Sequence, residues 1–235
     1  MRQVSQRGLL MVIGVIAALA AVNGLYLNFV KPSLRVPLLL ASAVLLLLGA
    51  HGVAQRRGED GPEHGDDGHD HGGRGPRVGW LLVVPFLLLG VVVPPPLGSW
   101  SATEDTGLIT VSSAEGLGPL PEGDPADLTL AEFQGRALFD PDRSLQGRTV
   151  RLVGFASPGT GGEWLLTRMS LNCCAADGFA VKVRVAGVPA VADDEWVRVT
   201  GTWRPAPIAA PESQELPVLE VRDLIRIPMP ENPYE

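Results

Sequence analysis

Histidine is absent from most of the chain. All four histidines lie between positions 51 and 71, so the sequence after residue 71 has no imidazole. Cys-His and Ser-His nucleophile pairs need an imidazole base beside the nucleophile. The glycines at 159, 161 and 162 are not followed by the Lys-Ser/Thr pair of a phosphate loop. We therefore expect no enzyme activity, and we assign no catalytic and no cofactor-binding residue.

Cysteine is scarce as well. The only two, Cys173 and Cys174, are adjacent. Successive α-carbons lie about 3.8 Å apart across a trans peptide, below the roughly 4.4 to 6.8 Å of an ordinary disulfide, so a bond between these two thiols would be strained. Because there is no third cysteine, a conventional structural disulfide within the chain is excluded.

Cations are in deficit in the C-terminal part of the chain. From Ser101 onward, 11 lysines and arginines stand against 20 aspartates and glutamates. Phosphate binding needs the opposite sign of charge, which excludes nucleic acid as an expected partner. This part is long enough for one hydrophobic core, and we expect a single domain there.

Long uncharged runs fill the N-terminal part. Gly8 to Val30 is a run of 23 residues, Val36 to Ala54 follows it, and Val78 to Leu97 is a run of 20 residues. About 20 apolar residues in a helix cross the hydrocarbon core of a bilayer. Residues 1–98 are therefore predicted to form about three transmembrane helices in contact with membrane lipid, the first two as antiparallel neighbours. A cleaved signal peptide is the alternative for the first run.

The distribution of arginine and lysine predicts the orientation. With three spans, six cations lie on one side of the membrane and two, Lys31 and Arg35, on the other; the six are Arg2, Arg7, Arg56, Arg57, Arg74 and Arg77. Positive charges near membrane ends stay cytoplasmic. We thus expect a multi-pass protein of the cell membrane with the domain after Trp100 outside the cytoplasm.

The loop at 55–77 between the second and third runs is rich in histidine and aspartate. It contains His64, His69 and His71 among several carboxylates. Imidazole and carboxylate together can hold a divalent cation, and the i, i+2 pair His69 and His71 can chelate if the chain bends. A solvated, charge-balanced polar loop is the other interpretation.

Period-two patterns dominate the C-terminal part. Residues 99–127 are rich in Gly, Pro and Ser and read as a linker that can lend one strand. Thr129, with Glu132 three residues on, predicts the capped start of one helix of about ten residues. Five strands are predicted, antiparallel by their short connections, at 149–156, 163–171, 179–185, 195–203 and 216–227. For residues 128–235 we expect a small all-β domain, an OB-like barrel in preference to a small sandwich.

Three interpretations of the cysteine pair are open. Cys173, Cys174 and Asp177 could supply two sulfurs and one carboxylate to a soft or borderline cation, with a fourth position left for water, a substrate or a partner. The pair could instead cycle through a strained disulfide. One or both residues could also be small, buried core hydrophobes. Arg168 is a candidate partner for Asp177 or a solvated strand residue.

Several segments carry a resemblance to a known family. Val153-Gly154-Phe155, Leu166 to Met169, the block Cys173-Cys174-Ala175-Ala176-Asp177, and Trp196 to Thr202 resemble the YcgQ family of permease subunits. The likeness extends to the layout of apolar spans before a β domain. It implies a companion of a multi-spanning YcgR-type permease and a link to a divalent metal such as zinc. The histidine-rich loop has no counterpart in this resemblance.

These observations lead to one expected function and two alternatives. We expect a non-enzymatic accessory subunit of a membrane permease, linked to the transport or binding of a zinc-like divalent ion. The first alternative is an extracytoplasmic thiol-disulfide redox protein that uses the adjacent cysteines. The second is a structural interaction domain whose cysteines are buried.

Overall fold

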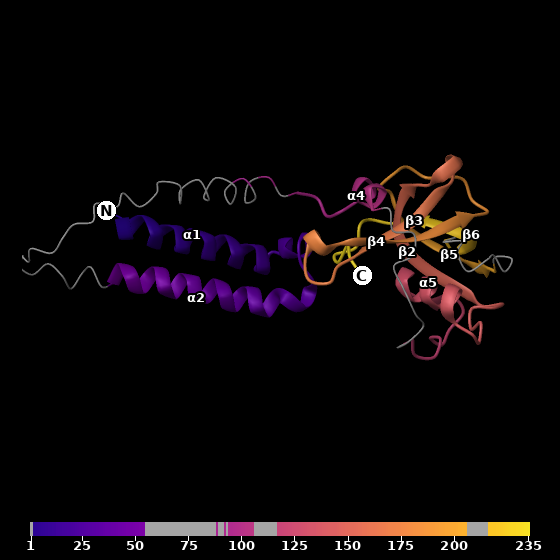
Figure 1. The fold of residues 1–235 in the computed structure, drawn as a ribbon, viewed down its shortest axis with the longest axis horizontal. Coiled ribbons are helices and arrows are strands. Elements are labelled where there is room, and N and C mark those ends of the chain that lie inside the picture. Colours follow the sequence, from indigo (N-terminus) through magenta and orange to yellow (C-terminus); the bar gives the residue numbers. More distant parts are fainter. Residues whose placement is uncertain (1, 55–87, 89–91, 93, 106–116, 206–215) are drawn as a thin grey trace, which may run out of the picture. The chain divides into compact units, whose positions relative to one another are not determined.

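The computed structural model describes residues 2–54, 88, 92, 94–105, 117–205 and 216–235 (Figure 1). The chain divides into two compact units, Met1–Pro94 and Pro95–Glu235. The histidine-rich loop and most of the third apolar run lie outside the described residues.

The first unit contains two helices that lie side by side, α1 (Arg2–Val22) and α2 (Arg35–Ala54) (Figure 1). Short 3-10 turns, η1 (Leu25–Asn28) and η2 (Pro32–Leu34), connect them. A Cβ on Gly14 would lie 3.0 Å from Leu46 Cγ, so this glycine lets the two backbones approach closely. Small residues serve this purpose where helices pack in a membrane. The predicted antiparallel pairing of the two runs is thus present.

One described helix is long and apolar enough to cross a membrane, at Pro32–His51. The apolar part of α1 is shorter, Gly8–Val22, and spans about 22 Å at about 1.5 Å per residue. The helix stops there because Gly24 adopts a φ of 79°, which ends the regular hydrogen bonding well before Val30. Where about three spans were predicted, the described part of the chain therefore contains one candidate span. A helix of this kind near the N-terminus fits a membrane anchor or a signal sequence.

The second unit is built on a six-stranded sheet. Its strands are β1 (Ala126–Asp127), β2 (Thr149–Pro158), β3 (Trp164–Ser170), β4 (Phe179–Ala186), β5 (Trp196–Arg204) and β6 (Val218–Arg226). Their order is β1-β2-β3-β4-β6-β5, and β5 also pairs with β2, so the pairing of the last five strands is cyclic. Each of the five predicted strands is present, with its ends within two residues of the predicted positions.

The expectation that the strands are all antiparallel was wrong. The pairs β1–β2 and β4–β6 are parallel, whereas the other pairs are antiparallel. The reason is geometric, because an odd number of strands in a cyclic order cannot alternate in direction all the way round. The parallel contact occurs where β6 lies between β4 and β5.

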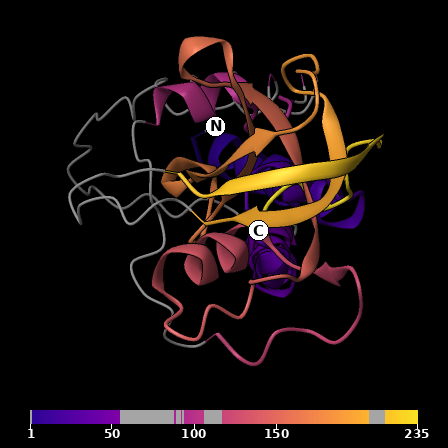
Figure 2. The same ribbon diagram turned by 90° about the vertical axis from the view of Figure 1, so that its right-hand side faces the viewer.

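The predicted helix is α5 (Leu130–Phe139), and it lies beside the strands (Figures 1 and 2). Thr129 accepts the N–H of Glu132, and Glu132 accepts the N–H of Thr129, which forms the expected capping box. On the buried face of α5, Leu130 and Phe133 are completely inaccessible to solvent. The carboxylate of Glu235 also accepts the N–H groups of Leu130 and Ala131, at 2.8 and 3.2 Å.

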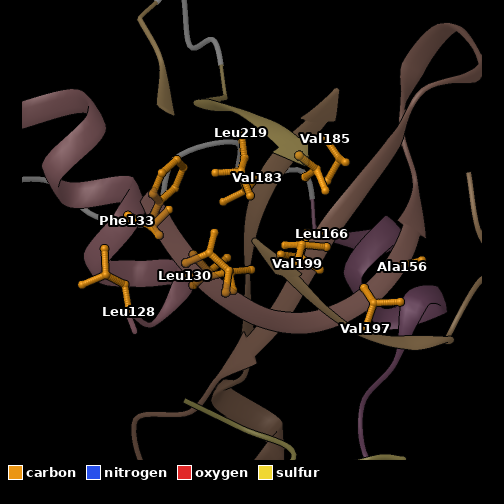
Figure 3. Packing of buried hydrophobic residues seen from close by; sticks show 14 of the residues in the cluster. Leu128, Leu130, Phe133, Ala156, Leu166, Val183, Val185, Val197, Val199 and Leu219 are labelled. Carbon is orange, nitrogen blue, oxygen red and sulfur yellow. The ribbon is translucent and has the colours of Figure 1, made fainter. Parts of the chain in front are cut away.

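The core of the second unit is aliphatic and lies between α5 and the sheet (Figure 3). Val183, Val199 and Leu219 come from three different strands and meet the α5 side chains there. A smaller cluster contains Phe155, Met169, Leu171 and Tyr234. This second cluster lies next to the loop that carries the cysteines, since Leu171 is two residues before Cys173.

A short helix, α4 (Ser99–Glu104), forms within the segment expected to be a linker. The carboxylate of Asp194 accepts hydrogen bonds from the N–H of Ser99 at 2.6 Å and from its hydroxyl at 2.7 Å. Ala102 is fully buried in the smaller cluster. These contacts hold α4 against the sheet domain. They depend on a residue far along the chain, which local composition does not reveal.

Candidate metal centre

The two cysteines lie in the connection between β3 and β4. Leu171 is buried and fixes the start of this connection, and the turn η6 (Ala175–Asp177) leads into β4. Ser170 and Phe179 pair at the end of the β3–β4 ladder, so the connection between these strands leaves and rejoins the sheet at the same place. A Cβ on Gly178 would lie 2.7 Å from Leu97 Cδ1, so a larger residue at this position would displace the Leu97 side chain.

The carboxylate of Asp177 organises the turn. It accepts the backbone N–H groups of Asn172, Cys173 and Cys174 at 3.0, 2.9 and 3.2 Å. In return, the side chain of Cys174 accepts the N–H of Asp177, which completes a capping box around η6. Three consecutive N–H groups therefore converge on one carboxylate, and they hold both thiol-bearing residues beside it.

One ligand atom from each of Cys173, Cys174 and Asp177 lies within 4.8 Å of the others. Cys173 is exposed, and Cys174 is half-buried. The interpretation of the pair as buried core residues is therefore wrong, because neither cysteine is buried. An ion could reach all three groups from solvent.

The protonation of the pair follows from its hydrogen bonds. The Cys173 thiol donates to Asp177, and this bond is the main cause that raises the pKa of Cys173 to about 11; its contact with Cys174 adds to the effect. The same thiol bond, followed by the backbone N–H groups, lowers the pKa of Asp177. At neutral pH, Cys173 is thus a neutral thiol beside an ionised carboxylate.

This arrangement suits a cation. A carboxylate has about four lone-pair directions, and here three accept backbone N–H groups while the thiol of Cys173 takes another. A cation that replaces the thiol proton would meet the thiolate and the carboxylate oxygen together. The charge of the ion would also offset the repulsion between these two anions. Two sulfurs and one oxygen suit a borderline or soft ion such as zinc.

The same features disfavour redox cycling. The thiolate is the species that attacks a disulfide, and the bond to Asp177 stabilises the protonated form of Cys173. The adjacent positions of the two cysteines add the strain described above. The geometry therefore supports cation binding better than thiol-disulfide exchange.

Arg168 does not pair with Asp177 and is not a solvated residue. Its guanidinium donates to the carbonyl of Asn232 at 2.7 Å and lies 4.9 Å from the centroid of the Trp196 ring. Only 9% of the residue is exposed. Its role is to fasten the last residues of the described chain to the sheet.

That final segment was not recognised from the sequence. Glu235 donates its N–H to Met169 at 3.0 Å, and the hydroxyl of Ser170 donates to the Glu235 carbonyl at 3.2 Å. Tyr234 forms a parallel bridge with Met169. The end of β3, from which the cysteine loop leaves, is thus supported by residues far along the chain. The Pro- and Asn-containing sequence of this segment gives no periodic signal.

His64, His69 and His71 lie outside the described residues. Their predicted weak cation site stays a prediction, separate from the centre formed by Cys173, Cys174 and Asp177.

Comparison with known proteins gives one match. No curated protein and no solved structure matches the chain. Residues 138–235 match the family described as the DUF1980 C-terminal domain. This range contains β2 to β6 together with Cys173, Cys174 and Asp177. The part of the chain that holds the whole candidate metal centre is therefore similar to the DUF1980 C-terminal domain.

Proposed function

We propose that this chain is a membrane-anchored accessory subunit of a permease and that it binds a zinc-like divalent cation at Cys173, Cys174 and Asp177. The convergence of their three ligand atoms within 4.8 Å carries the proposal. The backbone N–H groups that hold Asp177 make this convergence a property of the fold rather than of flexible side chains.

The surface of the α1–α2 pair supports the membrane anchor. Leu40 and Leu47 of α2 are 63% and 69% exposed, and Leu19 of α1 is 54% exposed. Exposed leucines in such numbers mark contact with lipid or with another transmembrane protein. In the proposed topology, residues 1–98 cross the membrane about three times. The excess of arginine on the side of the N-terminus then places the β domain outside the cytoplasm.

The cyclic strand pairing supports an OB-like barrel for the β domain. The order β2-β3-β4-β6-β5, with β5 returning to β2, is a five-stranded closed arrangement with one parallel contact. This fold hosts many functions, so the ligand has to be argued from the site. The proposed domain presents its cation centre on the connection between β3 and β4.

The partner in this proposal is a multi-spanning permease of the YcgR type. The resemblance of the Cys173–Asp177 block and its flanking segments to the YcgQ family supports this partner. With three ligands from the turn, a tetrahedral ion takes a fourth from water, a substrate or a partner protein. An open position of this kind permits an ion to be passed on.

Metal content of the purified full chain tests the cation centre. Wild-type protein in detergent micelles is stripped with a chelator, incubated with zinc, desalted and measured by elemental mass spectrometry. We expect about one ion per chain, as for a single site, and loss of that ion from the Cys173→Ser/Cys174→Ser variant. Asp193→Ala, which changes an exposed aspartate elsewhere, is the control and should keep the ion.

Two results would count against this function. Unchanged zinc in the double variant would remove these cysteines from the site. A chain without zinc, whose two thiols convert reversibly to a disulfide in a mass-tagging assay, would favour the redox alternative.

A cellular experiment tests the link to a permease. Cells lacking the chain should show an altered zinc content that wild-type protein restores and the double variant does not.

A further inference from the structure

The second unit contains an apolar cleft that the cation centre does not use. Its volume is about 550 Å³, and its walls come from α4 and the residues before it, from β2 and β5, and from the segment after β6. The side chains that matter below are those of Leu97, Trp100, Phe155, Trp196 and Met229.

Two of the lining residues, Phe155 and Trp196, are packed against their neighbours. Phe155 is 1% exposed and packs edge-on against Trp196, with ring centroids 5.5 Å apart. Trp196 also contacts the guanidinium of Arg168, which donates a hydrogen bond to the carbonyl of Asn232. The cleft is therefore a feature of the packed domain.

The rim, in contrast, presents large apolar groups to the outside. Trp100 is 76% exposed and Met229 is 48% exposed. Trp100 belongs to α4, which Asp194 fastens through both hydrogen bonds to Ser99. The exposed indole is thus held out on an anchored helix. A tryptophan presented in this way marks a surface that contacts something else.

Chain connectivity indicates what that surface contacts. Trp100 follows the end of the third apolar run, at Leu97, by three residues. Three residues reach at most about 10 Å. With that run in the bilayer, as the proposed function has it, Trp100 lies at the level of the lipid headgroups. Tryptophan is enriched at this level in membrane proteins.

The backbone hydrogen bonding of several rim residues also suits a position at the lipid headgroups. Pro95 and Pro96 have no N–H group to leave unpaired. Leu97 donates its N–H to the hydroxyl of Tyr234 at 3.0 Å, and Ser99 donates to Asp194. Unpaired backbone donors are costly in lipid, and Pro95, Pro96, Leu97 and Ser99 present none.

We propose that the cleft and Trp100 form a lipid-binding surface, here called the seat. Through this surface the β domain contacts the phospholipids of the membrane in which the chain is anchored. Trp100 and Met229 enter the boundary between headgroups and acyl chains, and the cleft receives acyl-chain carbons. Leu97 lines the cleft and also packs against Gly178, directly after Asp177. The seat therefore holds the cation centre near the membrane surface, where a membrane-embedded permease can receive the ion. This inference rests on the proposed membrane anchor.

Fluorescence quenching in lipid vesicles tests the seat. The full chain is reconstituted in phosphatidylcholine vesicles whose acyl chains are brominated close to the glycerol end, in a Trp80→Phe background that removes the tryptophan of the third run. We expect bromine quenching of the remaining emission to fall at least twofold on adding Trp100→Phe. Adding Trp203→Phe instead, which removes a β5 tryptophan outside the cleft, should leave the quenching in place.

A second pair of variants tests the cleft itself. Met229 and Ile225 are equally exposed at 48%, but only Met229 lines the cleft. Met229→Glu places a charge in the seat and should lower the quenching of Trp100 at least twofold, whereas Ile225→Glu should not. Equal effects of the two charges would overturn the seat, as would quenching that is insensitive to Trp100→Phe.

Resistance of the vesicle-bound chain to alkaline carbonate extraction reports the anchor separately. A chain that resists extraction while Trp100 escapes quenching would overturn the lipid seat and leave the anchor standing; this is also the result expected if a protein partner fills the cleft. A chain that carbonate removes from the vesicles would overturn the anchor and, with it, the seat.

Discussion

Asp177 holds Cys173 twice, by accepting its backbone N–H at 2.9 Å and by accepting its thiol. The first bond shapes the turn, and the second keeps the thiol protonated. One carboxylate thus determines both where the sulfur lies and how reactive it is.

Replacing this carboxylate by an amide should activate Cys173. Asp177→Asn removes the carboxylate whose hydrogen bond with the thiol is the main cause that raises the pKa of Cys173 to about 11, so the pKa should fall toward the ordinary 9.0. The thiolate fraction at pH 7.5 rises accordingly, and the lower nucleophilicity of a less basic thiolate offsets about half of the gain. We expect alkylation by iodoacetamide, followed by mass spectrometry, to be roughly tenfold faster.

Both proteins in this comparison carry Cys174→Ser, so that a single thiol is measured. Asp193→Asn in the same background is the control, because it removes an equal charge from an exposed position elsewhere. Equal alkylation rates for Asp177→Asn and the control would show that Asp177 does not set the protonation of Cys173.

Cation binding should strengthen as pH rises. The raised pKa of Cys173 means that an ion has to displace a proton from this thiol at neutral pH. Each proton released makes the apparent affinity about tenfold higher per pH unit. Competition of the full chain with a zinc chelator of known proton dependence, at pH 6, 7 and 8, measures this slope. A flat profile would contradict thiolate ligation.

Stability should depend on pH through Glu235. Burial is the main cause that raises its pKa above the ordinary 4.5, although the N–H groups of Leu130 and Ala131 lower it. The folded state therefore binds more protons than the unfolded state between 4.5 and the raised pKa, so this group favours folding below that window and less so above it. Glu235→Gln keeps an acceptor oxygen for one of the two N–H groups and removes the titration, so this variant should lose less stability than wild type as pH rises.

Urea unfolding of the full chain in detergent micelles, at pH 4.5 and pH 7, measures this difference. Glu231→Gln, a change at an exposed position close by, is the control and should follow the wild type. Identical pH profiles for Glu235→Gln and wild type would place the pH dependence on another group.

The packing of α5 should dominate the stability of the β domain. Phe133 is completely buried in the main core, whereas Phe139 of the same helix is 38% exposed. Phe133→Ala should lower the free energy of unfolding by about 3 to 5 kcal/mol. Thr129→Ala, which removes the helix cap, should cost about 1 kcal/mol. Phe139→Ala is the matched control, and a loss as large as that of Phe133→Ala would contradict this order.

The local elements of the β domain were predictable because each depends on neighbouring residues. The alternation of apolar and polar side chains located β2 to β6, and Thr129 with Glu132 located the start of α5. The apolar run at 8–30 was a weaker guide, since a single glycine at position 24 ends the helix within it. Hydropathy counts apolar residues, whereas helix length also depends on backbone conformation.

The amino-acid sequence by itself determined that the two cysteines are adjacent, that no third cysteine can pair with them, and that no histidine follows residue 71. Tertiary structure alone decided that Cys173 is exposed and Cys174 half-buried, that Arg168 lies on Trp196 rather than beside Asp177, and that α4 borders an apolar cleft. The physical reason is sequence separation. Strand pairing and the contacts of Asp194, Asn232 and Tyr234 join positions tens of residues apart, and no local pattern encodes which of them meet.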